Sequence, residues 1–431
     1  MNKNRYNAYG KMILGKDKEY SLDCYQTKLN NNVLVIGTPG SGKTEGIVKP
    51  NILEAEGSYI IADPKGNLYG KFKDYLETLG YDVKKLDFTK PEESSHYNPL
   101  AYITEEQDIV KVAHMLSMGQ ESICRTDPFW DYAASLLLQA LIAYICESRP
   151  LEKRKMSDIY ELVEMCEINE DSDRENALDM LFKDHEKIIK SIEGRRSFAV
   201  KQYKKFRIAA GKTLKSILIT LNAKLGSYDT SEINEMTSKD DIDIAGIGQK
   251  KTAAFVVVSD TDRSLDGLAN VFYSQSMNEL CRYADTECEN QKLPVPVRFI
   301  LDDFATNVCI HEFPRMISSI RSRGISAMII IQAESQLRAL YKEDANTVIC
   351  GCDTIVYLGG NDVDTAKAIS ERCNQPLNKV LNMPISKEWI FRRGELPAYI
   401  DKFDSMEKVN ELLSTTNTRT NTRTKVNQRA S

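Results

Sequence analysis

The stretch VLVIGTPGSGKTEGIVKPNI, residues 33–52, constrains the fold of this chain more than any other. Its apolar run Val33–Ile36 predicts a buried strand, and the residues from Glu45 onward predict a helix. Between them lies a glycine-rich turn that fits the pattern G-x-x-x-x-G-K-[ST]. A strand, such a turn and a helix in this order predict an α/β fold with an anion bound at the N-terminus of the helix.

The turn itself supplies the candidate phosphate site. Backbone N–H groups and the positive end of the helix converge on an anion at such a junction. The Lys43 ammonium can reach the β- and γ-phosphates of a nucleotide, and the Thr44 hydroxyl can bind Mg²⁺. The predicted nucleotide-binding residues are Gly37, Thr38, Pro39, Gly40, Ser41, Gly42, Lys43 and Thr44. A flexible Gly/Ser turn at the surface is the alternative.

Length and composition limit the class of protein. The chain has 431 residues, of which 42% are apolar and 28% charged, and this predicts a globular protein of two or three domains. A net charge of −5 argues against a wholly basic nucleic-acid-binding protein but leaves room for a local basic channel. The ten cysteines lack C-x-x-C pairs, and the four histidines show no metal-ligand spacing. We therefore expect reduced thiols and no zinc site.

No membrane span or signal peptide is expected from the sequence. The longest apolar run, Leu136–Cys146, contains Gln139 and is shorter than the roughly 18 residues that a span needs. The start, MNKNRYNAYGKM, lacks the apolar core of a signal peptide. The sequence thus predicts a cytoplasmic chain.

Further apolar runs predict the rest of the sheet. Strand character recurs at Tyr59–Ala62 and in the segments TAAFVVVS, VPVRFILDDFA, GISAMIIIQA and DTIVYLG. Helical stretches alternate with these runs, which predicts a mostly parallel sheet covered on both faces. Residues 126–243 are helical in pattern, and Asp127 and Pro128 predict the first helix start.

We therefore expect an interrupted domain arrangement. Residues 1–125 form the first part of a nucleotide-binding domain, and residues 244–413 form its second part. Residues 126–243 form an inserted all-α domain. The stretch 414–431 contains four basic residues and no acid, and its composition is typical of a disordered tail.

The segment VRFILDD, residues 297–303, predicts a second part of the nucleotide site. Its apolar positions lead to Asp302 and Asp303 at the strand end, where a carboxylate can reach the Mg²⁺ of a bound nucleotide. We assign Asp302 to the metal, through water, and Asp303 to polarising the attacking water. Because paired acids often follow a strand, an ordinary turn is the alternative.

An amide and two arginines complete the predicted site. The strand Met328–Ile331 runs into Gln332, whose amide can hydrogen-bond the γ-phosphate or the water if this strand neighbours the acidic pair. Arg321 and Arg323 precede that strand, and a guanidinium there can neutralise charge at the nucleotide of a neighbouring subunit. A glutamine that satisfies a strand end and arginines that are merely solvated are the alternatives.

Six motifs in this order resemble TraG/TraD-type coupling proteins of conjugative type IV secretion. They are GTPGSGKTEGIVKPNIL, GSYIIADPKGNLY, DPFW, RFILDDFATN, RSRGIS and IIIQAESQL, and the similarity spans about residues 32–401. The resemblance implies a RecA-like P-loop motor domain interrupted by an all-α domain, with ATP and Mg²⁺ as cofactors and a homo-hexameric ring. It also implies an ATPase that brings relaxase-bound single-stranded DNA to a secretion channel and drives its transfer.

The resemblance also assigns roles and partners. Lys43 and the hydroxyl that follows it bind phosphate and Mg²⁺, and Asp302 and Asp303 are the second acidic motif. Gln332 is the γ-phosphate sensor, and Arg321 is the inter-subunit arginine. The implied partners are relaxase or relaxosome proteins, the type IV secretion channel and a membrane partner that holds the chain at the inner face of the cell membrane.

Two departures from the family pattern matter. Asp303 stands where the family has glutamate, and its shorter side chain leaves the carboxylate about 1 Å too far from the water, which can slow hydrolysis on the order of 100-fold. The usual N-terminal transmembrane helices are missing, so we expect a separate membrane partner or a removed anchor. A cargo-recruiting adaptor with little hydrolysis is therefore the alternative function, whereas a chromosome-pumping ring motor is disfavoured by the helical insert.

A basic stretch in the helical region is a candidate DNA surface. Residues 181–215 carry 11 lysines and arginines against three acids, and Phe198, Tyr203 and Phe206 lie among them. Such a composition suits contact with a phosphate backbone and stacking on bases. A solvated basic face with aromatic residues packed in the core is the alternative. The basic tail could touch nucleic acid or acidic lipid, or have no role.

Overall fold

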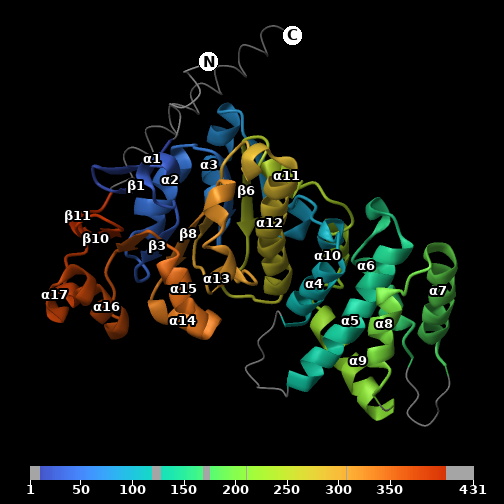
Figure 1. Cartoon of the computed structure of the whole chain (residues 1–431). Coiled ribbons are helices and arrows are strands. Elements are labelled where there is room, and N and C mark those ends of the chain that lie inside the picture. The colour runs from blue at the N-terminus through green and yellow to red at the C-terminus, as the bar shows by residue number, and fades with distance from the viewer. Residues whose placement is uncertain (1–9, 119–127, 168–174, 210, 307, 404–431) are drawn as a thin grey trace, which may run out of the picture. The chain divides into compact units, whose positions relative to one another are not determined.

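The computed structural model describes residues 10–118, 128–167, 175–209, 211–306 and 308–403. The chain separates into two compact units (Figure 1). Unit 1 comprises residues 1–85, 244–257 and 280–431, and unit 2 comprises residues 86–243 and 258–279. Asp127 at the expected helix start and the basic tail 414–431 lie outside the described residues. The domain boundaries expected at residues 126 and 244 stay a prediction.

A nine-stranded sheet runs through unit 1 in the order β11-β10-β9-β3-β8-β7-β4-β6-β5. The register is parallel for every pairing among β3, β4, β6, β7, β8 and β9, whereas β10 pairs antiparallel with β9 and with β11. The α/β fold with a mostly parallel sheet is thereby confirmed. The strands are β3 Val33–Ile36, β4 Ser58–Ala62, β5 Asp82–Asp87, β6 Thr252–Val257, β7 Val297–Leu301, β8 Ile325–Ile331, β9 Thr354–Tyr357, β10 Lys387–Arg392 and β11 Ala398–Asp401.

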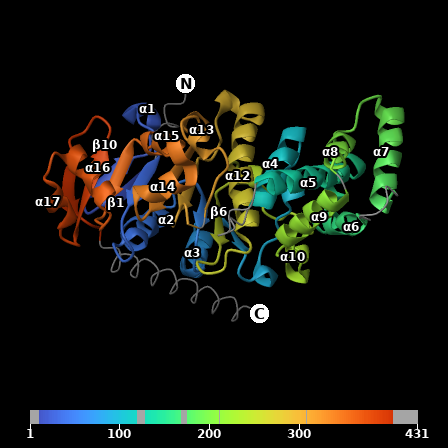
Figure 2. The ribbon, with the colours of Figure 1, turned by 90° about the horizontal axis from the view of Figure 1, so that it is seen from below.

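Helices cover both faces of this sheet, with α2 and α3 on one side and α13 and α15 on the other (Figure 2). A separate two-stranded hairpin, β1 with β2, precedes the sheet. These elements of unit 1 are β1 Lys11–Gly15, β2 Lys18–Ser21, α1 Cys24–Thr27, η1 Lys43–Val48, α2 Lys49–Leu53, α3 Asn67–Thr78, α11 Ile244–Ile247, η5 Glu289–Gln291, α13 Phe313–Met316, η6 Ile320–Arg323, α14 Glu334–Tyr341, η7 Lys342–Asp344, α15 Ala345–Cys350, α16 Val363–Cys373 and α17 Leu377–Leu381.

The central strand β3 shows why its sequence is uniformly apolar. All four of its residues are buried, and successive side chains point to opposite faces of the sheet. Val33 and Val35 belong to a core that also contains Ile52 of α2 and Phe72 of α3. Leu34 faces the other layer of helices. A parallel strand that is covered on both faces requires this continuous apolar run.

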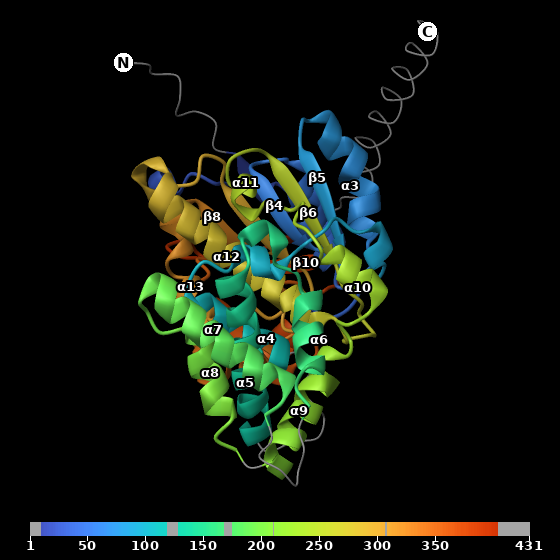
Figure 3. The same cartoon turned by 90° about the vertical axis from the view of Figure 1, so that its right-hand side faces the viewer.

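Unit 2 is mainly helical, and α5 packs against α4, α8 and α9 in its middle (Figure 3). Helix α12, Asp266–Glu287, begins in unit 2 and ends in unit 1. The other elements of unit 2 are η2 Pro91–Glu93, η3 Pro99–Tyr102, α4 Glu106–Met118, α5 Pro128–Ser148, η4 Leu151–Lys153, α6 Ser157–Glu164, α7 Ala177–Glu193, α8 Phe198–Phe206, α9 Gly211–Leu225 and α10 Ser231–Met236.

Helix α5 is longer than the apolar run Leu136–Cys146 suggested. Among the described helices, Phe129–Ser148 is the one with the length and composition to cross a membrane, and 56% of its apolar window is buried inside the structure. Gln139 does not interrupt it, because its side-chain amide donates to Ser135 Oγ one turn earlier, at 3.2 Å. Core helices of globular proteins have the same length and composition, and burial here places α5 in the core of unit 2.

Glu147, near the end of α5, ties α7 and the start of α8 to this helix. Its carboxylate accepts hydrogen bonds from His185 Nε2 at 2.7 Å, Ser197 Oγ at 2.6 Å and Phe198 N at 2.9 Å. Burial by itself raises the pKa of Glu147, but the hydrogen bonds from His185, Ser197 and Phe198 outweigh it and lower the pKa below its ordinary value. The ionised form of Glu147 therefore stabilises unit 2.

We expect Glu147→Gln to lower the free energy of unfolding at pH 7 by about 2 kcal/mol, because an amide replaces a carboxylate that accepts charge-assisted hydrogen bonds. The pKa of Glu147 is depressed in the folded state, so its contribution is present above the unfolded value of 4.5 and is lost as the pH falls through the folded value. Urea unfolding at pH 7 and at a pH below the folded pKa of Glu147 measures this contribution. Glu161→Gln, at an exposed position of α6, is the control. An equal effect of Glu147→Gln at both pH values would contradict the assignment.

Candidate nucleotide-binding site

Three strands bring the predicted site residues to one edge of the sheet. Strand β8 lies between β3 and β7, and Ile36 of β3 is opposite Ile331 of β8. Gly37 and Gln332 follow these two residues directly, and Gly37 N donates to Ile331 O at 3.1 Å. Asp302 follows the neighbouring strand β7. The carboxyl ends of parallel strands are where ligands bind in open α/β sheets, so the order of the strands assembles a site from distant segments.

The loop after β3 has the shape of an anion cradle. Gly40 and Gly42 have φ values of +76° and +92°, which residues with a side chain rarely adopt. A Cβ at Gly37 would lie 2.4 Å from Ser41 Oγ, so only glycine fits there without a shift. Ser41 Oγ is buried and has no hydrogen-bond partner among the described residues. An unpaired buried hydroxyl and a backbone path that only glycine permits fit a phosphate ligand.

The helix that follows begins at Lys43, two residues before the expected start at Glu45. Its first turn is the π-helical turn η1, in which Lys49 N donates to Thr44 O, and it continues into α2. The first N–H groups of a helix have no partner within it. The earlier start therefore turns the N–H groups of Lys43 and Thr44 into part of the cradle, and π-turns of this kind are frequent at functional sites.

Lys43 is held in the loop by carbonyl groups. Its Nζ donates to Gly37 O at 2.8 Å and to Thr38 O at 3.1 Å, and the residue is 8% exposed. Burial lowers the pKa of Lys43, and the charges of Asp303 and Asp302 counteract part of this effect. Lys43 forms no ion pair with any described residue. Its ammonium can therefore turn to a phosphate without breaking one.

Thr44 and Asp302 join the loop to the acidic strand end. Thr44 Oγ1 donates to Asp302 Oδ2 at 2.8 Å, and Asp302 is 5% exposed. Burial raises the pKa of Asp302, and the charge of Asp303 raises it further, whereas the hydrogen bond from Thr44 lowers it. A hydroxyl and a carboxylate are the oxygen ligands that Mg²⁺ prefers beside phosphates. No cluster of three or more His, Cys, Asp or Glu side chains that could hold a metal by itself occurs within the described ranges.

Asp303 and Gln332 lie in two turns that a further glutamine connects. Asp303 has a left-handed backbone with φ of +51°, which aspartate tolerates better than most residues. Gln332 N donates to Gln336 Oε1 at 2.7 Å, and Gln336 Nε2 donates to Thr306 Oγ1 at 3.2 Å. The expected condition for Gln332, that its strand neighbours the acidic strand, is met because β7 pairs with β8. The local sequence pattern did not predict a role for Gln336, although the residue lies in the motif IIIQAESQL.

Arg321 and Arg323 lie at the amino ends of the strands, opposite the phosphate loop, in η6 just before β8. Arg321 Nη2 donates to Cys24 O at 2.9 Å. Arg323 forms a two-point ion pair with Asp285, at 2.8 and 2.7 Å, which occupies its guanidinium. Neither contacts the loop of its own chain. A role for Arg321 at a nucleotide therefore requires the nucleotide of another subunit.

Lys402 touches the phosphate loop from a distant part of the chain. Its Nζ donates to Ser41 O and to Leu358 O, both at 2.8 Å. Burial lowers the pKa of Lys402 and, in the same region, raises the pKa of Glu388 to about 8, while each charge moderates the shift of the other. No signal in the local sequence links Lys402 to the loop, because 361 residues separate it from Ser41.

The aromatic residues of the basic stretch 181–215 belong to the core of unit 2. Phe198, Tyr203 and Phe206 are 8%, 4% and 2% exposed. The ring of Tyr203 stacks on Phe182 with 4.2 Å between centroids. The prediction that these side chains could stack on bases is wrong, because packing inside the helical unit removes them from solvent. Some of the cations pair within the unit, as Lys204 does with Glu186 at 2.7 Å.

A phosphate loop after a central parallel strand, with a lysine and a threonine opening the next helix and an acid on a nearby strand end, defines a P-loop nucleotide-binding fold. The sequence model for type IV secretory system conjugative DNA transfer matches residues 2–376. The chain therefore belongs to this family, as its resemblance to TraG/TraD-type coupling proteins predicted. No match is found among curated protein sequences.

Solved structures share this fold at low sequence identity. The unbound bacterial conjugative coupling protein TrwBdeltaN70 superposes with a TM-score of 0.65 at 15% identity, covering 92% of this chain and 89% of that one. TrwB in complex with ADP and Mg2+ gives 0.60 at 15% identity over 86% and 85% of the two chains. VirB4 of Thermoanaerobacter pseudethanolicus gives 0.56 at 13% identity over 92% and 97%. These likenesses confirm the P-loop α/β fold.

Proposed function

We propose that the chain is an ATP-driven coupling protein of conjugation. It recruits relaxase-bound single-stranded DNA and drives its transfer into a type IV secretion channel. The observation that carries this proposal is the 2.8 Å hydrogen bond between Thr44 and Asp302, which joins the phosphate loop to the acidic strand end in a chain of the conjugative DNA transfer family. A loop and an acid in contact are what a nucleotide-driven motor of this fold needs.

The proposed chemistry divides among the residues of the site. The loop from Gly37 to Thr44 binds the triphosphate of ATP, and Lys43 turns its ammonium from the loop carbonyls to the phosphates. Thr44 and Asp302 would hold Mg²⁺, which neutralises phosphate charge when bound. Asp303 orients and polarises the attacking water. TrwB structures with ADP and Mg2+ and with the ATP analogue ADPNP support this choice of cofactors.

Two further residues respond to the γ-phosphate. Gln332 follows β8 at the edge of the sheet where the loop and the acids lie, so its amide can sense whether this phosphate is present. Arg321 serves a neighbouring subunit in a homo-hexamer. Its guanidinium is at the amino ends of the strands, whereas the phosphate loop of its own chain is at their carboxyl ends. An arginine supplied by another subunit stabilises charge that develops during phosphoryl transfer.

The remaining partners follow from family membership alone. We propose contacts with relaxase or relaxosome proteins and with the secretion channel. We also propose a membrane partner that holds the chain on the cytoplasmic side of the cell membrane. The exposed cations of residues 181–215 are the proposed contact to the DNA backbone, without base stacking.

A nucleotide-dependent adaptor with little hydrolysis is the second candidate function. The observation that favours it is Asp303, where the family pattern has a longer acid. Such an adaptor binds nucleotide tightly and recruits cargo, but it does not turn ATP over at a rate that DNA controls.

Steady-state hydrolysis of Mg-ATP with and without single-stranded DNA separates the two functions. For a motor we expect DNA to raise the rate, because cargo on the ring completes the site between subunits. Raising the salt concentration is expected to weaken the stimulation, since the proposed contact is to phosphates. Tight nucleotide binding with no turnover under any of these conditions would instead support the adaptor.

A further inference from the structure

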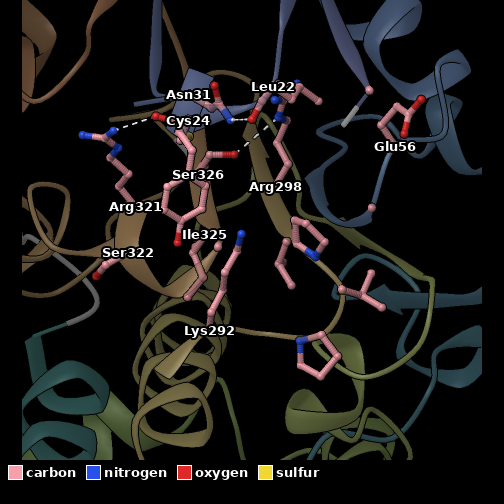
Figure 4. Close-up of a pocket in the computed structure, with 18 of the residues that line it drawn as sticks. Leu22, Cys24, Asn31, Glu56, Lys292, Arg298, Arg321, Ser322, Ile325 and Ser326 are labelled. Atoms are coloured by element: carbon pink, nitrogen blue, oxygen red, sulfur yellow. Dashed lines mark hydrogen bonds between the residues drawn. The ribbon is translucent and has the colours of Figure 1, made fainter. Parts of the chain in front are cut away.

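A pocket lies in unit 1 at the amino ends of the strands, away from the phosphate loop (Figure 4). Its volume of about 670 Å³ is within the range of small-molecule sites, roughly 300–1,000 Å³. Residues before β7, at the start of β8 and around α1 form its walls, and Leu22, Pro294 and Ile325 supply apolar surface. It shares no residue with the phosphate loop or the acidic strand end, although Arg321, the proposed inter-subunit arginine, lies on its wall.

Arg298 of β7 contributes a buried charge to this pocket. The residue is 6% exposed, and its only hydrogen bond to a described residue runs from Nε to Ser326 Oγ at a long 3.4 Å. It forms no ion pair within the described ranges. Four of the five N–H donors of this guanidinium thus have no partner among the residues that the structure describes. Buried charges in proteins are normally paired, since desolvation of an unpaired ion costs several kcal/mol.

The pocket around Arg298 holds more positive than negative side chains, although Glu56 favours the Arg298 cation without forming an ion pair with it. Arg321 and Lys292 also line the pocket, and Lys292 Nζ lies 5.0 Å from the ring centroid of Tyr25. Glu56 is the one acid on the wall, and it pairs with no described cation. Figure 4 shows Glu56 apart from Arg298, Arg321 and Lys292. The pocket therefore combines an excess of cations with apolar walls.

We propose that this pocket binds a small organic anion whose phosphate or carboxylate group pairs with Arg298 and whose apolar body lies against Leu22, Tyr25 and Ile325. A planar guanidinium can bind either group through two parallel hydrogen bonds. Tyr25 is 64% exposed and offers its ring to a flat ligand. The site is independent of the phosphate loop, because it lies at the other end of the strands.

Calorimetric titration of the Lys43→Ala protein tests this proposal, because that substitution weakens phosphate binding at the loop. The probes are phenyl phosphate and benzoate, with inorganic phosphate and sodium chloride at equal ionic strength for comparison. We expect one aromatic anion to bind one-to-one and more tightly than inorganic phosphate. Which of the two binds better identifies the anionic group. Failure of both to bind would overturn the proposal without touching the proposed nucleotide site.

Substitution of Arg298 locates the binding. Arg298→Met is expected to weaken the better probe at least tenfold, and Arg298→Lys, which keeps the charge but not the two-point geometry, is expected to weaken it less. Arg315→Met, at an exposed arginine outside the pocket, should change nothing. Equal affinity in Arg298→Met and its parent would overturn the assignment.

The melting temperature of the ligand-free proteins separates binding from folding. Removing an unpaired buried charge should leave the melting temperature of Arg298→Met equal to or above that of its parent. A marked fall would show that Arg298 has a structural role in the absence of ligand, which contradicts the proposal. Burial lowers the pKa of Arg298, in keeping with a charge that lacks a partner.

Discussion

Replacing Lys43 by alanine is expected to lower ATP turnover by about 10³-fold. Lys43 Nζ is 2.8 and 3.1 Å from two carbonyl oxygens of the loop, and no described acid holds it there. The two carbonyl groups thus hold the Lys43 ammonium within the loop, from where it can reach the phosphates of a bound nucleotide. Alanine removes the charge and leaves Gly37 O and Thr38 O without this donor. Initial rates at saturating Mg-ATP, with single-stranded DNA present, measure the loss.

The matched control for this substitution is Lys367→Ala. Lys367 is an exposed lysine of α16 in the same unit, with 58% of its side chain accessible, and its partner Asp364 is more exposed still. Its removal is expected to leave turnover and nucleotide affinity unchanged. A Lys43→Ala protein that keeps more than a tenth of the parent rate would disprove the assigned role. A melting temperature close to that of the parent would show that the loss is not caused by unfolding.

Local patterns were sufficient to predict the strands that surround the nucleotide site. Val33–Ile36 and Met328–Ile331 are apolar because both faces of the sheet are covered, and a buried parallel strand has this signature. The glycine pattern predicted the loop for a similar reason, since the left-handed backbone at Gly40 and Gly42 excludes other residues. These features depend on a few neighbouring residues, which the sequence displays directly.

The order of the strands is a different kind of information. The residues next to Thr44 and Asp302 in the sequence do not indicate that β8 lies between their strands. The two residues are 258 positions apart along the chain. The sequence supported the proximity of Gln332 and the acids only on the condition that β7 and β8 are neighbours. Packing of the whole unit decides that condition. Family resemblance could therefore predict the contact, whereas the residues alone left it open.

Buried polar residues were the hardest to interpret. Arg298 interrupts the apolar run VRFIL and gives no sign in the sequence that it lies on a central, covered strand. Lys402 and Glu388 belong to the edge strands and the segment after them, whose mixed polar pattern did not predict strands at all. Tyr203 stands among cations, yet its ring is inside the helical unit. In each case, distant segments create the environment that gives the side chain its role.

Asp303 offers the second large effect, because the two candidate functions differ in what they require of it. Asp303→Asn is expected to lower ATP turnover by about 10²- to 10⁴-fold if this carboxylate acts on the water as a general base. Asparagine is the same size and is well tolerated at the left-handed backbone found here, φ +51°. The loss would therefore reflect chemistry and not misfolding. Steady-state rates measured together with nucleotide affinity distinguish lost chemistry from misfolding, because a correctly folded Asp303→Asn protein should bind nucleotide almost as tightly as the parent.

Asp303→Glu is expected to act in the opposite direction. One more methylene brings the carboxylate about 1 Å closer to the water, which can raise the rate on the order of 100-fold. Glutamate adopts a left-handed backbone conformation less readily than aspartate, so a modest fall in melting temperature should accompany the faster rate. Asp364→Asn, with 89% of the Asp364 side chain accessible, controls for loss of a surface charge. If the parent, Asn and Glu proteins all turn ATP over at the same low rate, Asp303 does not act on the water and the chain works as an adaptor.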